Sequence, residues 1–223
     1  MRPTLHEVYE KLLAHYGPQG WWPAASPFEM MVGAILTQNT KWSNVARAID
    51  NLRESGVLEP RAMYALHLDE LAELIQPSGS QKVKAKRLHN LLRLVVERYE
   101  GSLEAMFDND RETLREQLLA VNGIGPETAD AILLYAGQMP TFVIDAYTHR
   151  ILARHGWVDF ETDYDNLKDF FESELERDAA LYNEYHGLLV KVGSEHCRKT
   201  PICDGCPLQE WLPECGPLSP PEW

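Results

Sequence analysis

Four cysteines late in the chain constrain its fold more than any other feature of the sequence. They are spaced as Cys197-x5-Cys203-x2-Cys206-x8-Cys215, and the chain has no others. We expect an intracellular protein, because the N-terminal sequence MRPTLHEVYEKL lacks the charged-then-apolar pattern of a secretory signal. Clustered cysteines in an intracellular protein indicate a metal site before they indicate disulfides. Residues 197–215 are therefore predicted to fold around a metal.

Length and composition are those of an ordinary globular protein, except for a strongly negative net charge. The 223 residues, 44% of them hydrophobic, suffice for one large domain or two small ones. No apolar run reaches the roughly 20 residues that cross a bilayer, so we expect no membrane partner. The formal net charge of −13 argues against a broadly basic surface for nucleic acid. Any nucleic-acid contact must use a local surface.

Short helical patterns with tight breaks between them favour an all-α fold. Ser26-Pro27-Phe28-Glu29 combines a capping residue, a proline at the first helical position and a glutamate three residues after the cap, which marks a helix start. Asp69 is expected to cap another helix. Thr141–Ile144 alone has the composition of a short strand. Further helices are expected near residues 5–13, 43–56, 111–119, 127–136, 145–155, 165–175 and 182–192.

The helix expected from Gln81 to Tyr99 carries a run of basic residues at its start. A basic run of this kind is usually a solvated helix face, and the alternative is a surface that faces nucleic acid. The basic run consists of Lys82, Lys84, Lys86 and Arg87. The apolar face of the same helix consists of Val83, Leu88, Leu91, Leu92 and Val95.

Two helical patterns are joined by a turn that contains Gly123, Ile124 and Gly125. Both glycines permit positive backbone dihedrals and the close approach of another chain. The backbone N–H groups that begin the following helix would point outward, where a phosphate is a natural acceptor. Such a turn offers DNA affinity without basic side chains, although a plain helix connection has the same pattern.

Asp145 follows the apolar run Thr141–Ile144, twenty residues after Gly125. An aspartate in this context is commonly a helix N-cap. The same carboxylate could stabilise positive charge on a deoxyribose while a glycosidic bond breaks, or orient the attacking water. We expect both roles together.

These residues resemble the helix–hairpin–helix glycosylases of the endonuclease III superfamily. Within it the chain is most similar to the branch that removes 3-methyladenine, through short matches in the right order. The resemblance implies a two-lobed α-helical fold, with residues 26–141 in one lobe and residues 1–25 and 142–223 in the other. It also implies a monomer that binds double-stranded DNA and flips a damaged base out of it. The matches are Trp21-Trp22-Pro23, Leu36 to Lys41, Pro77-Ser78-Gly79, Lys84 to Leu88 and Gly123-Ile124-Gly125.

Glu127 occupies the position where bifunctional relatives have a lysine. That lysine attacks the sugar and forms a Schiff base, which leads to strand cleavage. A carboxylate cannot do this, so the resemblance predicts hydrolysis by water with Asp145 as the catalytic carboxylate and without AP-lyase activity. Glu127 is either a second catalytic residue that positions the water or an acidic residue favoured by the helix dipole.

The resemblance also implies a base pocket and a set of DNA contacts. Trp22, Pro23, Trp42 and Gln38 are the candidates for the pocket, where a tryptophan face would attract a positively charged alkylated purine. Gln38 is alternatively a wedge into the duplex or a surface residue, and the tryptophans are alternatively core residues. The candidates for contacting DNA are Lys41, Gly123, Ile124, Gly125 and Thr128.

The cysteine tail resembles the loop that binds a [4Fe–4S] cluster in endonuclease III and its adenine-removing relatives. Zinc held by four thiolates is the alternative. The first spacing is one residue shorter and the last three residues longer than in that family, which leaves Cys215 the least secure ligand. The 3-methyladenine branch can lack the loop altogether. The chain therefore mixes features of two branches.

Four functions remain in view at the level of sequence. The leading one is a monofunctional DNA N-glycosylase for alkylated purines such as 3-methyladenine. The cysteine loop keeps open a glycosylase for oxidised or deaminated bases, and the missing lysine keeps open a non-catalytic protein that binds lesions. A helical metalloprotein unrelated to DNA would require every motif match to be accidental.

Overall fold

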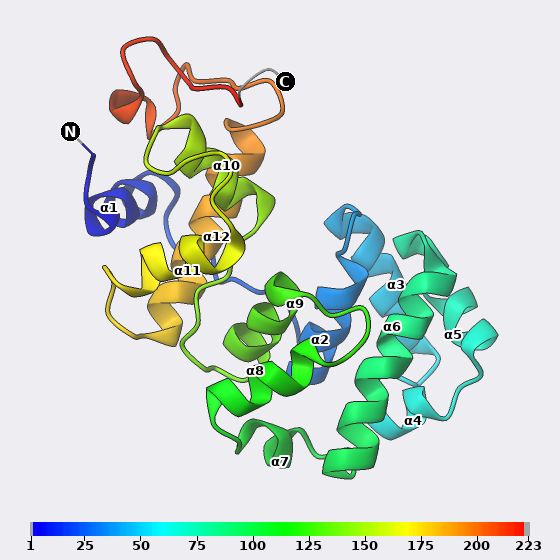
Figure 1. The fold of residues 1–223 in the computed structure, drawn as a ribbon. Helices are drawn as coiled ribbons and strands as arrows, with labels where there is room; N and C mark the ends of the chain where they lie inside the picture. Colours follow the sequence, from blue (N-terminus) through cyan, green and yellow to red (C-terminus); the bar gives the residue numbers. More distant parts are fainter. Residues whose placement is uncertain (1, 221–223) are drawn as a thin grey trace. The chain divides into compact units, whose positions relative to one another are not determined.

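The structure is a computed structural model that describes residues 2–220, and within them all regular secondary structure is helical (Figure 1). The all-α prediction is therefore confirmed. Thr141–Ile144 forms no strand and is a buried connection without regular secondary structure. None of the helices in the described range is long and apolar enough to span a membrane.

The chain divides into two compact units, which are described separately. Unit 1 contains residues 1–22 and 140–223, and unit 2 contains residues 23–139. The helices of unit 1 are α1 (Leu5–Tyr16), α10 (Ala146–Arg154), α11 (Tyr164–Glu172), α12 (Ala179–Glu195) and a 3-10 turn η4 (Gln209–Trp211). The helices of unit 2 are α2 (Pro27–Leu36), α3 (Trp42–Glu54), α4 (Pro60–Tyr64), α5 (Leu68–Leu74), η1 (Gln76–Ser78), α6 (Gln81–Arg93), η2 (Leu94–Arg98), α7 (Leu103–Phe107), α8 (Arg111–Leu119), α9 (Pro126–Ala131) and η3 (Ile132–Ala136).

Helix α2 is the central element of unit 2. Every residue from Phe28 to Leu36 is buried, as expected for a helix that is apolar on all sides and packs against α3, α6, α9 and η3. Its start matches the sequence prediction, because the Ser26 hydroxyl accepts a hydrogen bond from the Glu29 N–H. The buried Glu29 carboxylate is in turn paired with Arg53 at 2.9 Å.

Helices α8 and α9 of unit 2 are joined by a buried ion pair. Both carboxylate oxygens of Asp130 accept hydrogen bonds from the guanidinium of Arg115, at 2.8 and 3.1 Å. Asp130 is fully buried, whereas Arg115 keeps part of its side chain in solvent. The bidentate geometry fixes the two helices against each other on either side of the Gly123 turn.

Unit 1 is built around α12, which packs against α1 and α10. Leu5, Val8 and Leu12 of α1 are buried at helical spacing. Phe142 and Phe171 stack with ring centroids 3.9 Å apart, and Tyr185 of α12 meets both rings edge-on. This aromatic core lies directly under the segment that leads into Asp145.

Candidate active site

Asp145 is the N-cap of α10, as the sequence predicts. Its Oδ1 accepts a hydrogen bond of 2.7 Å from the backbone N–H of Thr148. Its Oδ2 lies 3.9 Å from Nε2 of His186, and 14% of the Asp145 side chain is exposed. The helix start therefore fixes one carboxylate oxygen and leaves the other directed toward a histidine.

The segment before Asp145 is anchored from its side by Glu172 of α11. Oε1 of Glu172 accepts hydrogen bonds from the Phe142 N–H at 2.8 Å and from the Thr141 hydroxyl at 3.2 Å. These bonds pair polar groups of a buried, non-helical stretch of backbone, which would otherwise be destabilising. Glu172 thus helps to hold the segment that leads into Asp145.

His186 of α12 was missed in the sequence interpretation. Its side chain is buried, and burial lowers the pKa of the imidazole while the Asp145 carboxylate opposes this shift. The ring of Trp21 lies 6.5 Å from it between centroids. No local pattern could reveal His186, because it meets Asp145 only through the packing of α10 on α12.

Trp21 and Trp22 lie next to each other at the end of the N-terminal part of unit 1. Their ring centroids are 5.3 Å apart, and both side chains are partly buried. Trp21 packs so closely on Gly187 that a Cβ at that position would lie 2.9 Å from the Cβ of Trp21. Within unit 1 the structure therefore brings Trp21, His186 and Asp145 into one neighbourhood.

The hairpin of unit 2 runs from α8 to α9 through residues 120–125. Gly123 has φ +99°, whereas Gly125 has φ −97° and begins α9 as its N-cap. Of the two glycines that permit a positive dihedral, only Gly123 adopts one. Ile124 is buried and its N–H donates to the Val121 carbonyl at 3.0 Å, so its side chain anchors the turn.

Gln38 is tied to this hairpin. Its Nε2 donates to the Thr128 hydroxyl at 3.1 Å and to the Gly123 carbonyl at 3.4 Å. Its Oε1 accepts a hydrogen bond from the guanidinium of Arg87 on α6. Asn90, one turn further along α6, donates to the Asn122 carbonyl at 3.0 Å. The amide of Gln38 therefore helps to hold the hairpin.

Lys84 departs from the expectation of a solvated basic face. It is 3% exposed, and its Nζ donates to the Leu36 carbonyl at 2.8 Å and to the Ser78 carbonyl at 2.7 Å. Burial lowers the pKa of this ammonium group, with Arg87 adding to the shift. Lys84 links the C-terminal end of α2 to η1, while Lys82 and Lys86 are exposed.

The remaining candidates are mostly on the surface of unit 2. Lys41 is the exposed N-cap residue of α3 but makes no side-chain cap bond, and Trp42 follows it with 37% of its side-chain surface exposed. Pro23 is exposed, and Glu127 is an exposed residue in the first turn of α9.

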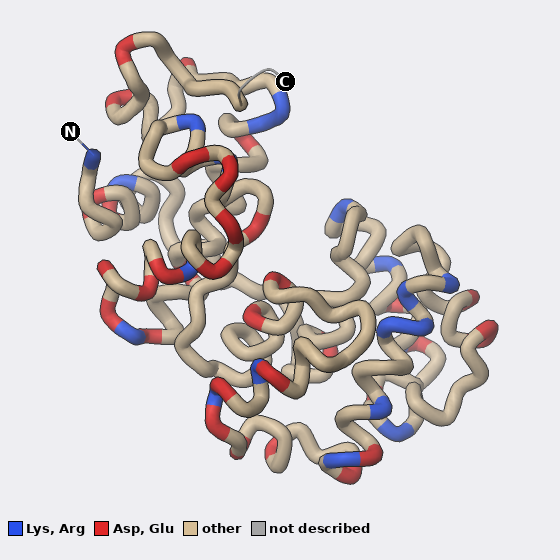
Figure 2. Tube along the Cα trace, viewed as in Figure 1, with Lys and Arg blue, Asp and Glu red and all other residues tan. Residues whose placement is uncertain are grey.

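Charge is distributed unevenly along each unit (Figure 2). Residues 81–98 of unit 2 contain six Lys or Arg and one Glu. In this segment, Arg87 packs against Gly123 and Asn90 donates to the Asn122 carbonyl of the hairpin. In unit 1, residues 159–178 contain nine Asp or Glu and two Lys or Arg. The net negative charge is therefore compatible with a local basic surface beside the hairpin.

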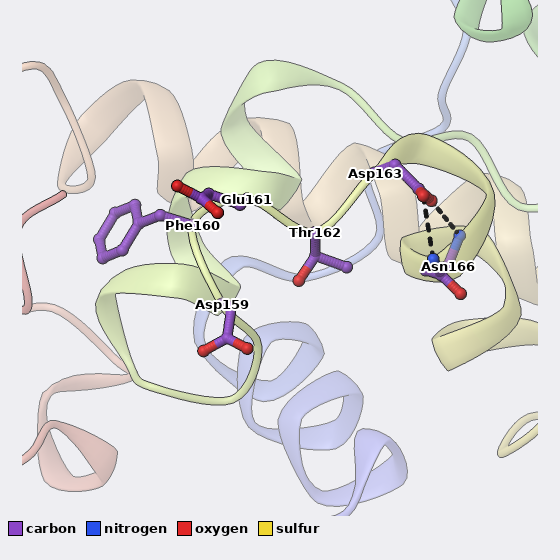
Figure 3. A pocket seen from close by; sticks show the side chains of 6 residues that line it. All are labelled: Asp159, Phe160, Glu161, Thr162, Asp163 and Asn166. Carbon is purple, nitrogen blue, oxygen red and sulfur yellow. Dashed lines mark hydrogen bonds between the residues drawn. The ribbon is translucent and has the colours of Figure 1, made fainter. Parts of the chain in front are cut away.

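The acidic stretch of unit 1 lines an open hollow (Figure 3). Its walls are Asp159, Phe160, Glu161, Thr162, Asp163 and Asn166. Asp163 caps α11, with its two oxygens accepting hydrogen bonds from the backbone and side-chain amides of Asn166 at 2.9 and 3.0 Å. Carboxylates gathered in this way repel phosphate, so the hollow is unsuited to contact with a DNA backbone.

Three of the four cysteines share one small cavity in unit 1. Cys197, Cys203 and Cys206 line it together with Arg154 and His155. Arg154 donates to the sulfur of Cys197 at 3.4 Å, and Arg150 donates to the Cys197 carbonyl at 2.6 Å. Cys215 is exposed, and no group of three or more ligand side chains at metal-binding distance is found among residues 2–220.

The chemistry of this donor set suits a thiolate-bound metal. Burial raises the pKa of the Cys203 thiol, with the neighbouring Cys197 adding to the shift, and burial also raises the pKa of the Cys206 thiol. Metal binding deprotonates such thiols, and the guanidinium of Arg154 is placed to offset the resulting negative charge. Cys197, Cys203 and Cys206 therefore fit a metal, whereas Cys215 is exposed and lies outside the cavity that the other three line.

Comparison with known proteins decides the family. The sequence profile of the HhH-GPD superfamily base excision DNA repair proteins matches residues 32–177, which is more than half of the chain. The chain belongs to the HhH-GPD superfamily. This HhH-GPD protein is a member of the endonuclease III superfamily, and its class of activity is that of a DNA glycosylase in base excision repair.

Two curated relatives match this HhH-GPD protein over most of its length. One is a Methanocaldococcus jannaschii protein, named as a provisional DNA repair glycosylase, which is 46% identical over 93% of this chain and 94% of its own. The other is endonuclease III of Thermotoga maritima, which is 28% identical over 81% of this chain and 79% of its own.

Solved structures agree on the fold of the HhH-GPD protein. The 3-methyladenine DNA glycosylase of Helicobacter pylori, bound to 1,N6-ethenoadenine, is 33% identical with a TM-score of 0.74 and covers 85% of this chain and 96% of its own. A non-covalent endonuclease III–DNA complex has a TM-score of 0.80 at 20% identity, with 94% of each chain covered. The second likeness shows the fold alone.

Proposed function

We propose that this protein is a monofunctional DNA N-glycosylase that removes alkylated purines, such as 3-methyladenine, from double-stranded DNA. The observation that carries the proposal is the Asp145 carboxylate in a base excision repair fold, with one oxygen held by the Thr148 N–H and the other directed toward His186. The relative that removes 3-methyladenine, at 33% identity, supports the substrate class.

Asp145 has a direct electrostatic role in this reaction. The sugar gains positive charge as the glycosidic bond breaks, and a fixed carboxylate nearby stabilises that charge. An alkylated purine is already cationic, so it leaves as a neutral base and needs little help from a general acid. Water then adds to the sugar, and Asp145 accepts its proton directly or through a second water.

Glu127 makes strand cleavage by this protein unexpected. It lies in the first turn of α9, two residues after Gly125, where a lysine would be needed to form a Schiff base with the sugar. A carboxylate in this place is favoured by the positive end of the helix dipole. We propose that Glu127 positions the water and that the product is an intact strand with an abasic site.

The hairpin and the start of α3 are the proposed DNA contacts. Gly125 has open space where a Cβ would stand, so the backbone there can approach a phosphate. Thr128 is held by Gln38, and Ile124 anchors the turn beneath. Lys41, together with exposed Lys82 and Lys86 of α6, adds positive charge on unit 2.

Trp22 and Trp42 are the proposed stacking partners of the damaged base, with Pro23 as a further wall. The partial exposure of each tryptophan leaves ring surface for a ligand. A cationic purine gains about 0.5–2 kcal/mol from an aromatic face beyond ordinary stacking. In this proposal the side-chain amide of Gln38 mainly supports the hairpin, and only the solvent-exposed part of this side chain reaches the pocket.

The cysteine loop is proposed to hold a [4Fe–4S] cluster through Cys197, Cys203, Cys206 and Cys215, with zinc as the alternative. When bound, the cluster supplies a crosslink that ties the tail into a compact loop. Two arginines of α10 also hold the loop in place. Arg150 and Arg154 donate hydrogen bonds to backbone carbonyls at the start of the loop, those of Cys197, Arg198 and Lys199. The three sulfurs that share one cavity support this assignment.

The decisive experiment incubates the protein with methylated duplex DNA and identifies released bases by mass spectrometry. We expect 3-methyladenine or 7-methylguanine to be released, with strand breaks only after alkali. An Asp145→Asn variant that folds and binds DNA should release base at least about 100-fold more slowly, as expected for loss of a catalytic charge. Equal rates for the variant and the wild type would remove Asp145 from the mechanism.

A glycosylase for oxidised or deaminated bases is the second candidate. The cysteine loop favours it, because curated relatives over more than 80% of this chain are named endonuclease III. A panel of duplexes with one defined lesion each, assayed under single turnover, separates the candidates. Damage-dependent binding without release of any base would instead indicate a lesion-binding protein.

A further inference from the structure

We propose that His186 is a positioning residue for Asp145, which donates a hydrogen bond from Nε2 to Oδ2 and fixes the carboxylate for catalysis. The inference rests on the proposed glycosylase function of Asp145. It assigns a role to a residue for which the sequence offers no motif. His186 acts through Asp145 and does not touch the DNA in this proposal.

The packing of α12 places His186 beside Asp145. Gly193 lets α12 approach α10 so closely that a Cβ there would lie 2.6 Å from the Cβ of Tyr147. Gly187, the residue after His186, allows the same kind of approach by Trp21. Two close contacts of this kind leave the imidazole little freedom to move away from the carboxylate.

The separation of the two groups fits a bond that tightens during the reaction. Nε2 and Oδ2 are 3.9 Å apart, which exceeds a hydrogen bond by about 1 Å. Catalytic hydrogen bonds are often long in the free enzyme and shorten in the complex. Oδ1 is already held by the Thr148 N–H, so a relative shift of about 1 Å between Oδ2 and the imidazole would complete the pairing.

Neutral histidine is the form that suits this task. His186 is 4% exposed, and an imidazolium in that position would pair with Asp145 and cancel the charge that the sugar cation requires. A neutral imidazole with its proton on Nε2 orients the carboxylate and leaves the negative charge in place. The lowered pKa of His186, caused by burial, is consistent with the neutral form at neutral pH.

The test combines two substitutions at position 186 with a packing control. His186→Phe keeps a ring of similar shape without a donor, and His186→Gln places an amide nitrogen near the position of Nε2. Leu189→Met, at a buried position one turn along the same helix, controls for altered packing. Each variant is measured for thermal stability, affinity for methylated DNA and single-turnover rate of base release.

We expect His186→Phe to slow base release roughly 10- to 100-fold at unchanged DNA affinity, the loss typical of a hydrogen bond to a charged group. His186→Gln should recover most of the rate, and Leu189→Met should match the wild type. In the Asp145→Asn background, His186→Phe should have no further effect. Wild-type release by a folded His186→Phe protein, or additive losses in the double variant, would overturn the proposal.

Nitrogen-15 NMR of the histidines tests the pairing without any activity or substitution at position 186. In the wild type, the His186 signals should show a neutral ring with the proton on Nε2, and Asp145→Asn should shift them. Unshifted signals would sink the pairing even if alkylated bases are released. If the wild type releases no alkylated base while the signals shift, the proposed substrate is wrong and the pairing stands.

Discussion

Position 123 has no room for a side chain, because a Cβ there would lie 2.3 Å from Cγ of Arg87 and φ is +99°. Gly125, two residues later, has φ −97° and nothing within 4 Å of a Cβ. The two glycines of the hairpin therefore have different physical reasons to be present. The fold requires glycine at position 123. At position 125 the glycine leaves open space at the protein surface.

We predict that Gly123→Ala lowers the free energy of unfolding by about 2–4 kcal/mol, through backbone strain and overpacking. Gly125→Ala should change it by less than about 1 kcal/mol, because its dihedrals and surroundings accept a methyl group. Calorimetry or denaturant unfolding of both variants measures the difference. Equal destabilisation by the two substitutions would contradict this account.

At the residue scale, sequence reasoning succeeded where the signal was local. Asp145 was expected to be an N-cap and is one, because capping depends on a few neighbouring residues. Lys84 was assigned to a solvated face and is buried, because its acceptors Leu36 and Ser78 come from other parts of the chain. His186 escaped notice for the same reason.

At the element scale, the Arg115–Asp130 pair holds α8 and α9 in the hairpin geometry. We predict that Arg115→Met destabilises the protein by about 3–5 kcal/mol, because it leaves Asp130 buried without its bidentate partner. Arg47→Met, at an exposed position of α3, is the matched control and should change stability by less than about 0.5 kcal/mol. A wild-type unfolding midpoint for Arg115→Met would show that the pair contributes little.

The bond from Phe142 to Glu172 makes a second prediction at this scale. Glu172→Ala removes the acceptor of the Phe142 N–H, so this amide should exchange its hydrogen with solvent at least about 10-fold faster. Base release should fall as well, since the segment that positions Asp145 is loosened, while DNA affinity stays the same. Glu172→Gln retains an oxygen acceptor and should show a smaller effect. Unchanged exchange at Phe142 would count against the anchoring role.

Element boundaries were predictable to the extent that they carried capping or periodic signals. The start of α2 matched Ser26, whereas α5 is capped by His67 with its partner Glu70, and the expected cap Asp69 lies inside the helix. Val83 was placed on the apolar face of α6 but is 51% exposed. It precedes Leu88 by five residues, and at 3.6 residues per turn the two side chains point in clearly different directions from the helix axis. The five-residue helices α4 and α7 are too short to show a period.

At the scale of the whole molecule, the cysteine loop ties the last part of unit 1 to α10 through Arg150 and Arg154. We predict that Cys206→Ser loses the bound iron and lowers the unfolding temperature, whereas Asp204→Ala, exposed in the same loop, retains both. Visible absorption and quantification of iron, sulfide and zinc provide the readout. Stoichiometric zinc without iron in the wild type would replace the cluster by the alternative metal.

Whole-molecule properties were the hardest to judge from composition. A net charge of −13 suggested a poor partner for DNA, yet residues 159–178 are strongly acidic and residues 81–98 strongly basic. The average therefore hid a separation that depends on position along the chain. The all-α class, in contrast, followed from repeated helical patterns, because class requires no knowledge of which helices meet.

Unit 1 is assembled from two stretches of chain that are separated by the whole of unit 2. During synthesis, α1 emerges from the ribosome long before α12, against which its buried face packs. At a synthesis rate of about 5–20 residues per second, roughly 10–40 s pass before α12 has been made. During this time the apolar face of α1 has no partner to pack against; it consists of Leu5, Val8 and Leu12. Unit 2 is continuous and is complete earlier, so this chain is expected to fold from its middle outward, with α1 as the segment that most needs protection from other chains.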